Sequence, residues 1–90
     1  MSLKGIEYVL SSELRLKILS ALSKGSGTPT QLSKEVQKHL SHISRALHEL
    51  EDRELVLCAT PNVSKPRVYT LTEHGNEVVS EIYRRVRLNI

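Results

Sequence analysis

The residues with the most usable chemistry lie together between Ser41 and His48, where short polar side chains surround a single arginine. An arginine can donate two hydrogen bonds to the O6 and N7 atoms of one guanine, and Arg45 is the candidate for such a contact. Hydroxyl and imidazole groups can bond to base edges or to phosphates. The acidic residues of the stretch are held back to its far end. The pattern predicts a surface that approaches an anion with its first turns, through Ser41, His42, Ser44, Arg45 and His48.

Two short helices joined by a tight connection are expected to position these side chains. Apolar residues recur at steps of three or four, which turns one stripe of each helix toward a shared core. The members of this stripe are Leu32, Val36, Leu40, Ile43, Leu47 and Leu50. A capping box with a proline at the first helical position begins at Thr28, so the first helix should run from about Pro29 to Gln37. The start of the second helix stays open, because Gln37, His39 or Ser41 can each serve as its cap.

After Glu54 the helical period gives way to two extended segments, 55–60 and 67–72, which predicts a β-hairpin. Prolines bound the loop between the segments and exclude it from a central ladder, so the tip should project and stay irregular. The charged residues of this loop region are Lys65 and Arg67, both positive.

Helical periodicity also extends toward both ends of the chain. A short first helix is marked by Leu3, Ile6 and Leu10. The stripe of the next helix is Leu14, Ile18, Ala21 and Leu22. Ser11 or Ser12 should cap that second helix, and the glycines of 24–27 should end it. A last helix is expected after a cap at Thr72 and runs to about Leu88, with acids early and arginines late, as the helix dipole prefers.

The last helix carries a wide apolar face. At about 100° per residue this face spans roughly 140°, more than one small domain would cover. Its later members should lie beyond the reach of the domain and contact a second copy of the chain. The expected dimer residues are Val79, Ile82, Tyr83, Val86 and Ile90. In the alternative, the short N-terminal helix covers part of this face from within the chain.

Two sequence words resemble the winged helix repressors of the MarR and ArsR types. The first combines Leu32 with the segment 43–50, ISRALHEL, which is similar to the V-S-R-x-L-x-x-L run of a recognition helix. The second is R-x-Y-x-L-T-x-x-G, which ends the wing of such repressors and here occupies 67–75. Three residues depart from the family pattern in the turn and at the end of the recognition helix. They are Gln37, Lys38 and Glu54, of which the first and last replace glycines.

The resemblance implies an α+β fold that is mainly helical, a winged helix-turn-helix with a three-helix core, a two-stranded β-wing and a C-terminal helix. We expect residues 1–90 to form one domain, with its core at about 12–75 and the helix at about 72–88 used for dimerisation. In the family the wing tip lies along the minor groove or the backbone, which makes Lys65 and Arg67 candidate contacts. Lys34 and Lys38 are candidates for further backbone contacts.

Composition excludes several other kinds of protein. The chain has a net charge of +3, no Phe or Trp, and a lone cysteine, Cys58, so an internal disulfide is excluded and aromatic stacking on bases is not expected. Its four histidines lack the pairing of a metal site, so neither a metal nor another cofactor is expected. No catalytic constellation is present, which argues against an enzyme. Without an apolar run near eighteen residues, we expect no membrane association and a cytoplasmic location.

These observations together predict a prokaryotic transcriptional regulator that binds double-stranded DNA as a homodimer. An effector ligand cannot be read from the residues. The rival hypothesis is a winged helix module that docks to protein or binds RNA without operator specificity, since one fold serves several functions.

Overall fold

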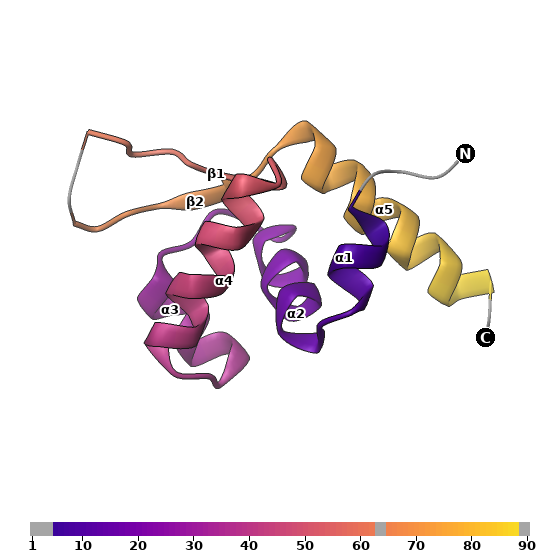
Figure 1. The fold of residues 1–90 in the computed structure, drawn as a ribbon, viewed down its shortest axis with the longest axis horizontal. Coiled ribbons are helices and arrows are strands. Elements are labelled where there is room, and N and C mark those ends of the chain that lie inside the picture. Colours follow the sequence, from indigo (N-terminus) through magenta and orange to yellow (C-terminus); the bar gives the residue numbers. More distant parts are fainter. Residues whose placement is uncertain (1–4, 63–64, 89–90) are drawn as a thin grey trace.

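The computed structural model describes residues 5–62 and 65–88 of the chain. In chain order the elements are α1 (Ile6–Leu10), α2 (Glu13–Leu22), α3 (Pro29–Val36), α4 (Leu40–Asp52), β1 (Val56–Cys58), β2 (Tyr69–Leu71) and α5 (Glu73–Leu88). Figure 1 shows α3, α4 and the hairpin at one end of the molecule, α2 in the middle, and α1 beside α5 at the other end. This is the winged helix architecture that the two sequence words predicted.

Local side-chain chemistry starts the helices where the sequence predicted. The Ser12 hydroxyl accepts a hydrogen bond from the backbone N–H of Arg15 at 3.3 Å and caps α2. At α3 the capping box is complete, since the Gln31 N–H donates to the Thr28 hydroxyl and the Thr28 N–H donates to the Gln31 side chain. Each cap satisfies backbone donors that the first turn of a helix otherwise leaves free. The N-cap of α4 is His39, whose side chain makes no capping bond.

The two departures from glycine keep the backbone conformation that glycine would adopt. Gln37 ends α3 with φ 61°, and Glu54 follows α4 with φ 59°, both in the left-handed region. The turn at Glu54 is held by backbone bonds, because its N–H donates to the Glu51 carbonyl at 2.9 Å and the Leu55 N–H donates to the Leu50 carbonyl at 3.0 Å. The family geometry of the turn and of the helix end is therefore preserved without its usual residues.

One apolar core, aliphatic except for Tyr69, joins all the helices and both strands. Its buried residues on α3 and α4 are Leu32, Val36, Ile43, Ala46, Leu47 and Leu50. The prediction that Leu40 belongs to the core is wrong, because it is 48% exposed, and Leu10 is exposed to the same extent. Leu40 begins α4, one turn before the core residues of that helix, and Leu10 ends α1, where Ile6 and Val9 carry the packing. On α2 the buried residues are Ile18, Leu19 and Leu22, while Leu14, Leu16 and Ala21 are only partly buried. Leu3 lies outside the described residues.

The hairpin is antiparallel and shorter than predicted, with Val56 paired to Leu71 and Cys58 paired to Tyr69. A further bridge joins Tyr69 to Gly27, through N–H to carbonyl distances of 3.0 and 2.8 Å. The segment just before α3 thus adds to the outer side of β2 and fixes the base of the wing against the helical core.

The terminal helix is covered from within the chain more fully than the sequence predicted. Ile82 is only 2% exposed and Val79 4%, so the prediction that Ile82 lies beyond the reach of the domain is wrong. The physical reason is the packing of α2 against α5, where the Ser20 and Tyr83 hydroxyls share a hydrogen bond, together with α1, which lies beside α5 (Figure 1) and contributes to the same buried cluster. Tyr83 and Val86 remain 43% and 53% exposed. Ile90 lies outside the described residues. No helix in the described ranges is long and apolar enough to cross a membrane.

Candidate nucleic-acid interface

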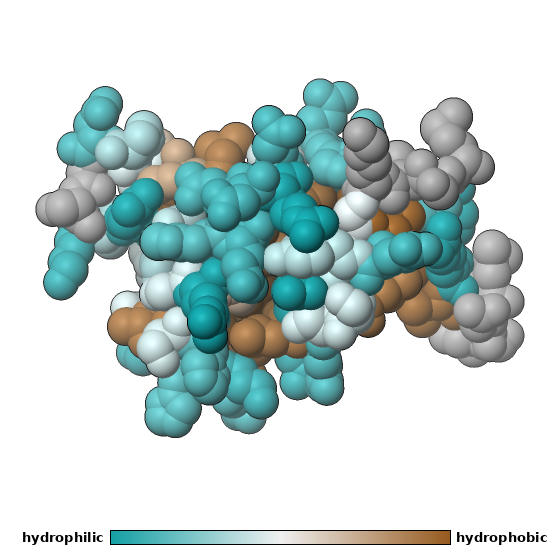
Figure 2. Space-filling view, in the orientation of Figure 1, coloured by the Kyte–Doolittle hydropathy of each residue, from teal (hydrophilic) through white to brown (hydrophobic). Residues whose placement is uncertain are grey.

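The predicted contact residues of α4 lie on its outer surface, away from the face of the helix that packs into the core. Ser41, His42, Arg45 and His48 are exposed, and Ser44 is half-buried at the edge of the core. In Figure 2 hydrophilic residues cover most of the visible side of α4. No side chain caps this helix, and its third N–H, that of His42, donates to the His39 carbonyl at 3.0 Å, so the N–H groups of Leu40 and Ser41 are the ones left to meet an anion.

A first groove lies at the turn between α3 and α4. Its lining residues are Ser33, Lys34, Gln37, Lys38, His39, Leu40 and His42. The Ser33 hydroxyl donates to the Lys38 carbonyl at 2.5 Å and holds the turn closed. The rings of His39 and His42 meet edge to face with their centres 5.9 Å apart. Both predicted lysines of this region, Lys34 and Lys38, are exposed and border the same groove as His42.

A second groove separates the helix-turn-helix from the wing. It is lined by Thr28, Pro29, Thr30, Leu40, Ser44, Lys65, Pro66 and Arg67. The fold therefore brings the two predicted wing cations next to Ser44 of α4, about twenty residues away in the chain. Lys65 and Arg67 are both exposed. Basic residues thus border both grooves, and Leu40 contributes to both.

Arg67 is anchored on the hairpin while it stays accessible. Its guanidinium lies 5.8 Å from the centre of the Tyr69 ring and beside the Cys58 thiol. Burial raises the pKa of Cys58, but hydrogen bonds from the Thr60 backbone and from Arg67 outweigh it, so this pKa lies below its ordinary value. Contacts with the thiol of Cys58 and the ring of Tyr69 restrict the position of the Arg67 guanidinium. Within the described residues, Lys65 makes no comparable side-chain contact.

The candidate cations keep their charge available. Within residues 5–62 and 65–88, the ion pairs join Arg15 to Glu49, Lys17 to Glu13, and Arg84 to Glu81. None of them uses the cations of α3, α4 or the wing that were predicted to contact DNA. An unneutralised basic surface that borders two grooves fits a polyanion better than a small neutral ligand.

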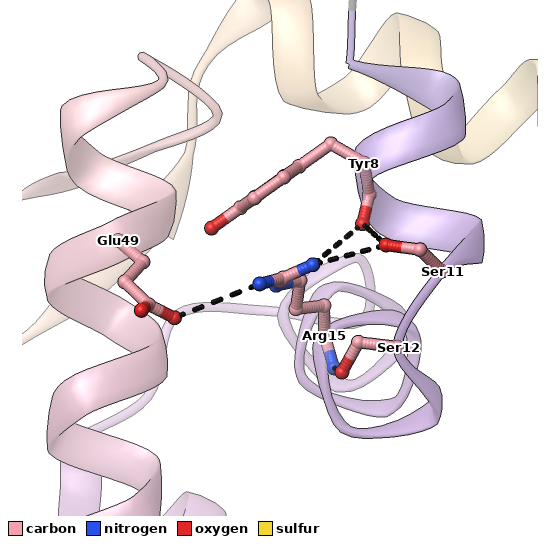
Figure 3. Close-up of polar contacts among 5 residues, drawn as sticks. All are labelled: Tyr8, Ser11, Ser12, Arg15 and Glu49. Carbon is pink, nitrogen blue, oxygen red and sulfur yellow. Dashed lines mark hydrogen bonds and ion pairs between the residues drawn. The ribbon is translucent and has the colours of Figure 1, made fainter.

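The far end of α4 is tied to the rest of the domain by a cluster that sequence reasoning missed. Figure 3 shows Arg15 of α2 reaching between α1 and α4. Its guanidinium donates to the Tyr8 carbonyl at 2.9 Å and to the Ser11 hydroxyl at 3.1 Å, and lies 3.9 Å from the Glu49 carboxylate. It also lies 3.7 Å from the centre of the Tyr8 ring, and Arg53 lies 4.0 Å from that centre. The cluster sets the position of α4 from the end opposite to its candidate contact surface.

The two grooves are also lined by residues that the sequence did not indicate as candidate contacts. These are His39 and Leu40 at the exposed start of α4 and Thr30 at the start of α3. The position of Leu40, one turn before the first core residue of α4, could have indicated that it is exposed. Its helical phase matched that of the core residues, however, and so it was predicted to be buried. Among the described residues, no group of three or more histidine, cysteine or acidic side chains is arranged to hold a metal ion.

The fold of the chain is similar to those of several solved structures. The chain superposes on a MarR family transcription regulator with a TM-score of 0.82 at 25% identity, over 96% of this chain and 58% of that one. A MarR family transcriptional regulator from Silicibacter pomeroyi DSS matches at 28% identity and a TM-score of 0.74, over 90% and 56% of the two chains. A mutant of Lactococcus lactis ZitR matches at 20% identity and a TM-score of 0.73, over 81% and 51%. The chain thus spans about half of the length of these proteins.

The fold is therefore that of MarR-family winged helix regulators, and the matches do not bear specifically on the ArsR side of the resemblance. No curated protein sequence matches the chain. A family model described as the HVO_A0261 N-terminal domain matches residues 3–88, almost the whole chain. The chain belongs to the HVO_A0261 N-terminal domain family.

Proposed function

We propose that this chain binds duplex DNA in a sequence-specific manner and acts as a transcription regulator. The observation that carries the proposal is the common placement of the exposed start of α4 and the basic wing on either side of one groove. An α-helix fits the major groove of B-DNA, and the N-terminal residues of a recognition helix contact base edges. The MarR family names of its structural neighbours support the same function.

In this proposal the surface divides into base contacts and backbone contacts. Arg45 reads a guanine, with Ser41, His42, Ser44 and His48 around it. The remaining contacts are to phosphates or the minor groove, through Lys34, Lys38, Lys65 and Arg67. The N–H groups of Leu40 and Ser41 at the start of α4 add one more place for a phosphate.

The proposal includes a homodimer that reads a palindromic site. Among residues 73–86 of α5, the exposed apolar residues for such a contact are Tyr83, whose hydroxyl is held by Ser20, and Val86, and they replace Ile82 as the centre of the expected interface. The core of about 12–75 would then carry DNA binding and the helix of about 72–88 the dimer contact. A two-fold pair would place two recognition helices about 34 Å apart, one turn of DNA.

The test begins with selection of bound fragments from a pool of genomic DNA and titration of the best duplex and a scrambled duplex at one fixed salt concentration. We expect Arg45→Ala to weaken the selected duplex by about 1 to 3 kcal/mol, roughly 5- to 150-fold, and to leave the scrambled duplex nearly unchanged. Arg85→Ala is the matched control, because it removes the same charge from an exposed position on α5.

Each outcome has a defined meaning. Equal losses on both duplexes for Arg45→Ala would mean that Arg45 contacts phosphate rather than a base. Absence of any salt-dependent binding to duplex DNA would refute the proposed function and would favour a module that docks to protein or binds RNA.

A further inference from the structure

We infer that Leu40 is a specificity-determining residue that contacts the C5-methyl group of a thymine in the major groove, an inference that rests on the proposed function. Leu40 is the first residue of α4 and is 48% exposed. Single exposed leucines are common on protein surfaces, so the inference rests on the position and surroundings of Leu40 and not on its exposure alone.

Leu40 is the apolar side chain that α4 leaves available. The other apolar residues of this helix are Ile43, Ala46, Leu47 and Leu50, and none is more than 4% exposed. Every further exposed residue of its first turns is polar or charged. If the helix makes an apolar contact with a base, Leu40 must make it.

The surroundings of Leu40 match DNA rather than another apolar partner. Leu40 lines both grooves of the site and so lies on the ridge between them. Lys34 and Lys38 border the groove on one side, and Lys65 and Arg67 border the groove on the other. A ridge with cations on both sides suits a ligand that presents apolar groups between two lines of phosphates. The major groove has that arrangement, and the thymine methyl is the apolar group that it displays.

Helix geometry also directs this side chain toward the bases. Each Cα–Cβ bond of an α-helix is tilted toward its N-terminus, so the first residue extends past the helix end. The N-terminal residues are the ones that a recognition helix places against base edges. Ser44, one turn later on the same side, lines the same groove as Leu40 and can bond to a neighbouring base.

The experiment replaces thymines of the selected duplex, one at a time, by deoxyuridine, which lacks only the methyl group. At one position we expect the wild-type protein to lose about fourfold in affinity, the effect of one buried carbon. Leu40→Ala should lose about as much or more on the thymine duplex and should be insensitive to deoxyuridine at that position. Leu10→Ala is the matched control, since this leucine is equally exposed at 48% but lies on α1 at the other end of the molecule.

The deoxyuridine series on the wild-type protein needs no variant and therefore does not depend on how Leu40→Ala folds. Equal affinity of the wild-type protein for every thymine and deoxyuridine duplex would overturn the inference while leaving sequence-specific binding in place. A methyl effect that persists unchanged in Leu40→Ala would also overturn it. Failure to bind any duplex would refute the proposed function itself, and the inference with it.

Discussion

Replacing Gly75 with alanine should destabilise the protein sharply, although alanine is ordinarily the better helix former. Gly75 lies in the first turn of α5 and is the glycine of the second family word. A Cβ atom here would lie far inside van der Waals contact with the Leu55 carbonyl oxygen, 3.1 Å from its carbonyl carbon and 3.4 Å from Leu71 Cδ2. The nearest obstacle is main chain, which cannot rotate away as a side chain can.

The backbone around this contact has little freedom to move. The Leu55 carbonyl accepts from the Thr72 N–H at 3.1 Å, the Thr72 hydroxyl donates to the Glu54 carbonyl at 2.6 Å, and the Gly75 N–H donates to the same hydroxyl at 2.9 Å. Overpacking costs about 1–3 kcal/mol, and a rigid obstacle places this case near the upper limit. The helix propensity of alanine returns about 1 kcal/mol. The net loss is about 2 kcal/mol, which for a domain of this size lowers the melting temperature by about 8–16 °C.

Thermal unfolding followed by circular dichroism measures this loss, and Gly27→Ala is the matched control. Gly27 is also buried, but a Cβ there would meet its nearest neighbours, Gln31 Oε1 and Leu32 Cγ, at an ordinary 3.7 Å. We expect the control to change the stability by less than about 1 kcal/mol. A Gly75→Ala protein that melts with the wild type would refute the close approach of α5 to Leu55. Equal losses in both variants would assign the effect to glycine replacement in general.

Three further predictions concern the wing, the dimer and the cluster at the far end of α4. Removal of both Lys65 and Arg67 should weaken binding to all duplexes and flatten the slope of log K against log salt by about two units, and an unchanged slope would place the wing away from DNA. The intact chain should sediment as a dimer at tens of micromolar and a Tyr83→Asp, Val86→Asp variant as a monomer; a monomeric intact chain would refute the dimer. Tyr8→Leu should lower the free energy of unfolding in urea by about 1–2 kcal/mol, because its contacts with two guanidinium groups are lost. Tyr8→Phe keeps the ring and should therefore keep most of the wild-type stability. Equal losses in the two Tyr8 variants would assign the effect to the hydroxyl group.

Features set by neighbouring residues could be predicted from the sequence. The capping box at Thr28, the hairpin and the cap of α5 at Thr72 follow from side chains within a few positions of the backbone groups that they bond. The ion pair between Glu81 and Arg84 also follows from helical spacing, at 3.6 Å. The candidate contact surface belongs to this class, since the outward phase of Arg45 and its neighbours depends only on the helical period.

Features that join distant segments could not be predicted in the same way. Gly27 is the single residue that pairs with Tyr69 from the segment before α3, and one residue cannot show the alternating pattern that predicts a strand. The approach of Tyr8 to Arg53 depends on where α1 packs, which no local pattern records. The sequence identifies Gly75 as part of the second family motif. The physical reason for a glycine there is the close approach of the Leu55 carbonyl, which only the structure reveals.

The two wrong predictions on burial have one physical origin and opposite consequences. Helical periodicity assigns a residue to a side of its helix, but burial also requires another element to extend over that point. Leu40 is in phase with the core and yet exposed, because α4 begins a turn before its packing does. Ile82 was expected to need a second subunit and yet is buried, because α2 packs against α5 and α1 adds to the same cluster. An apolar residue in phase with the core but left uncovered is therefore the kind of residue to examine for a partner, which on α4 is Leu40 and on α5 is Val86.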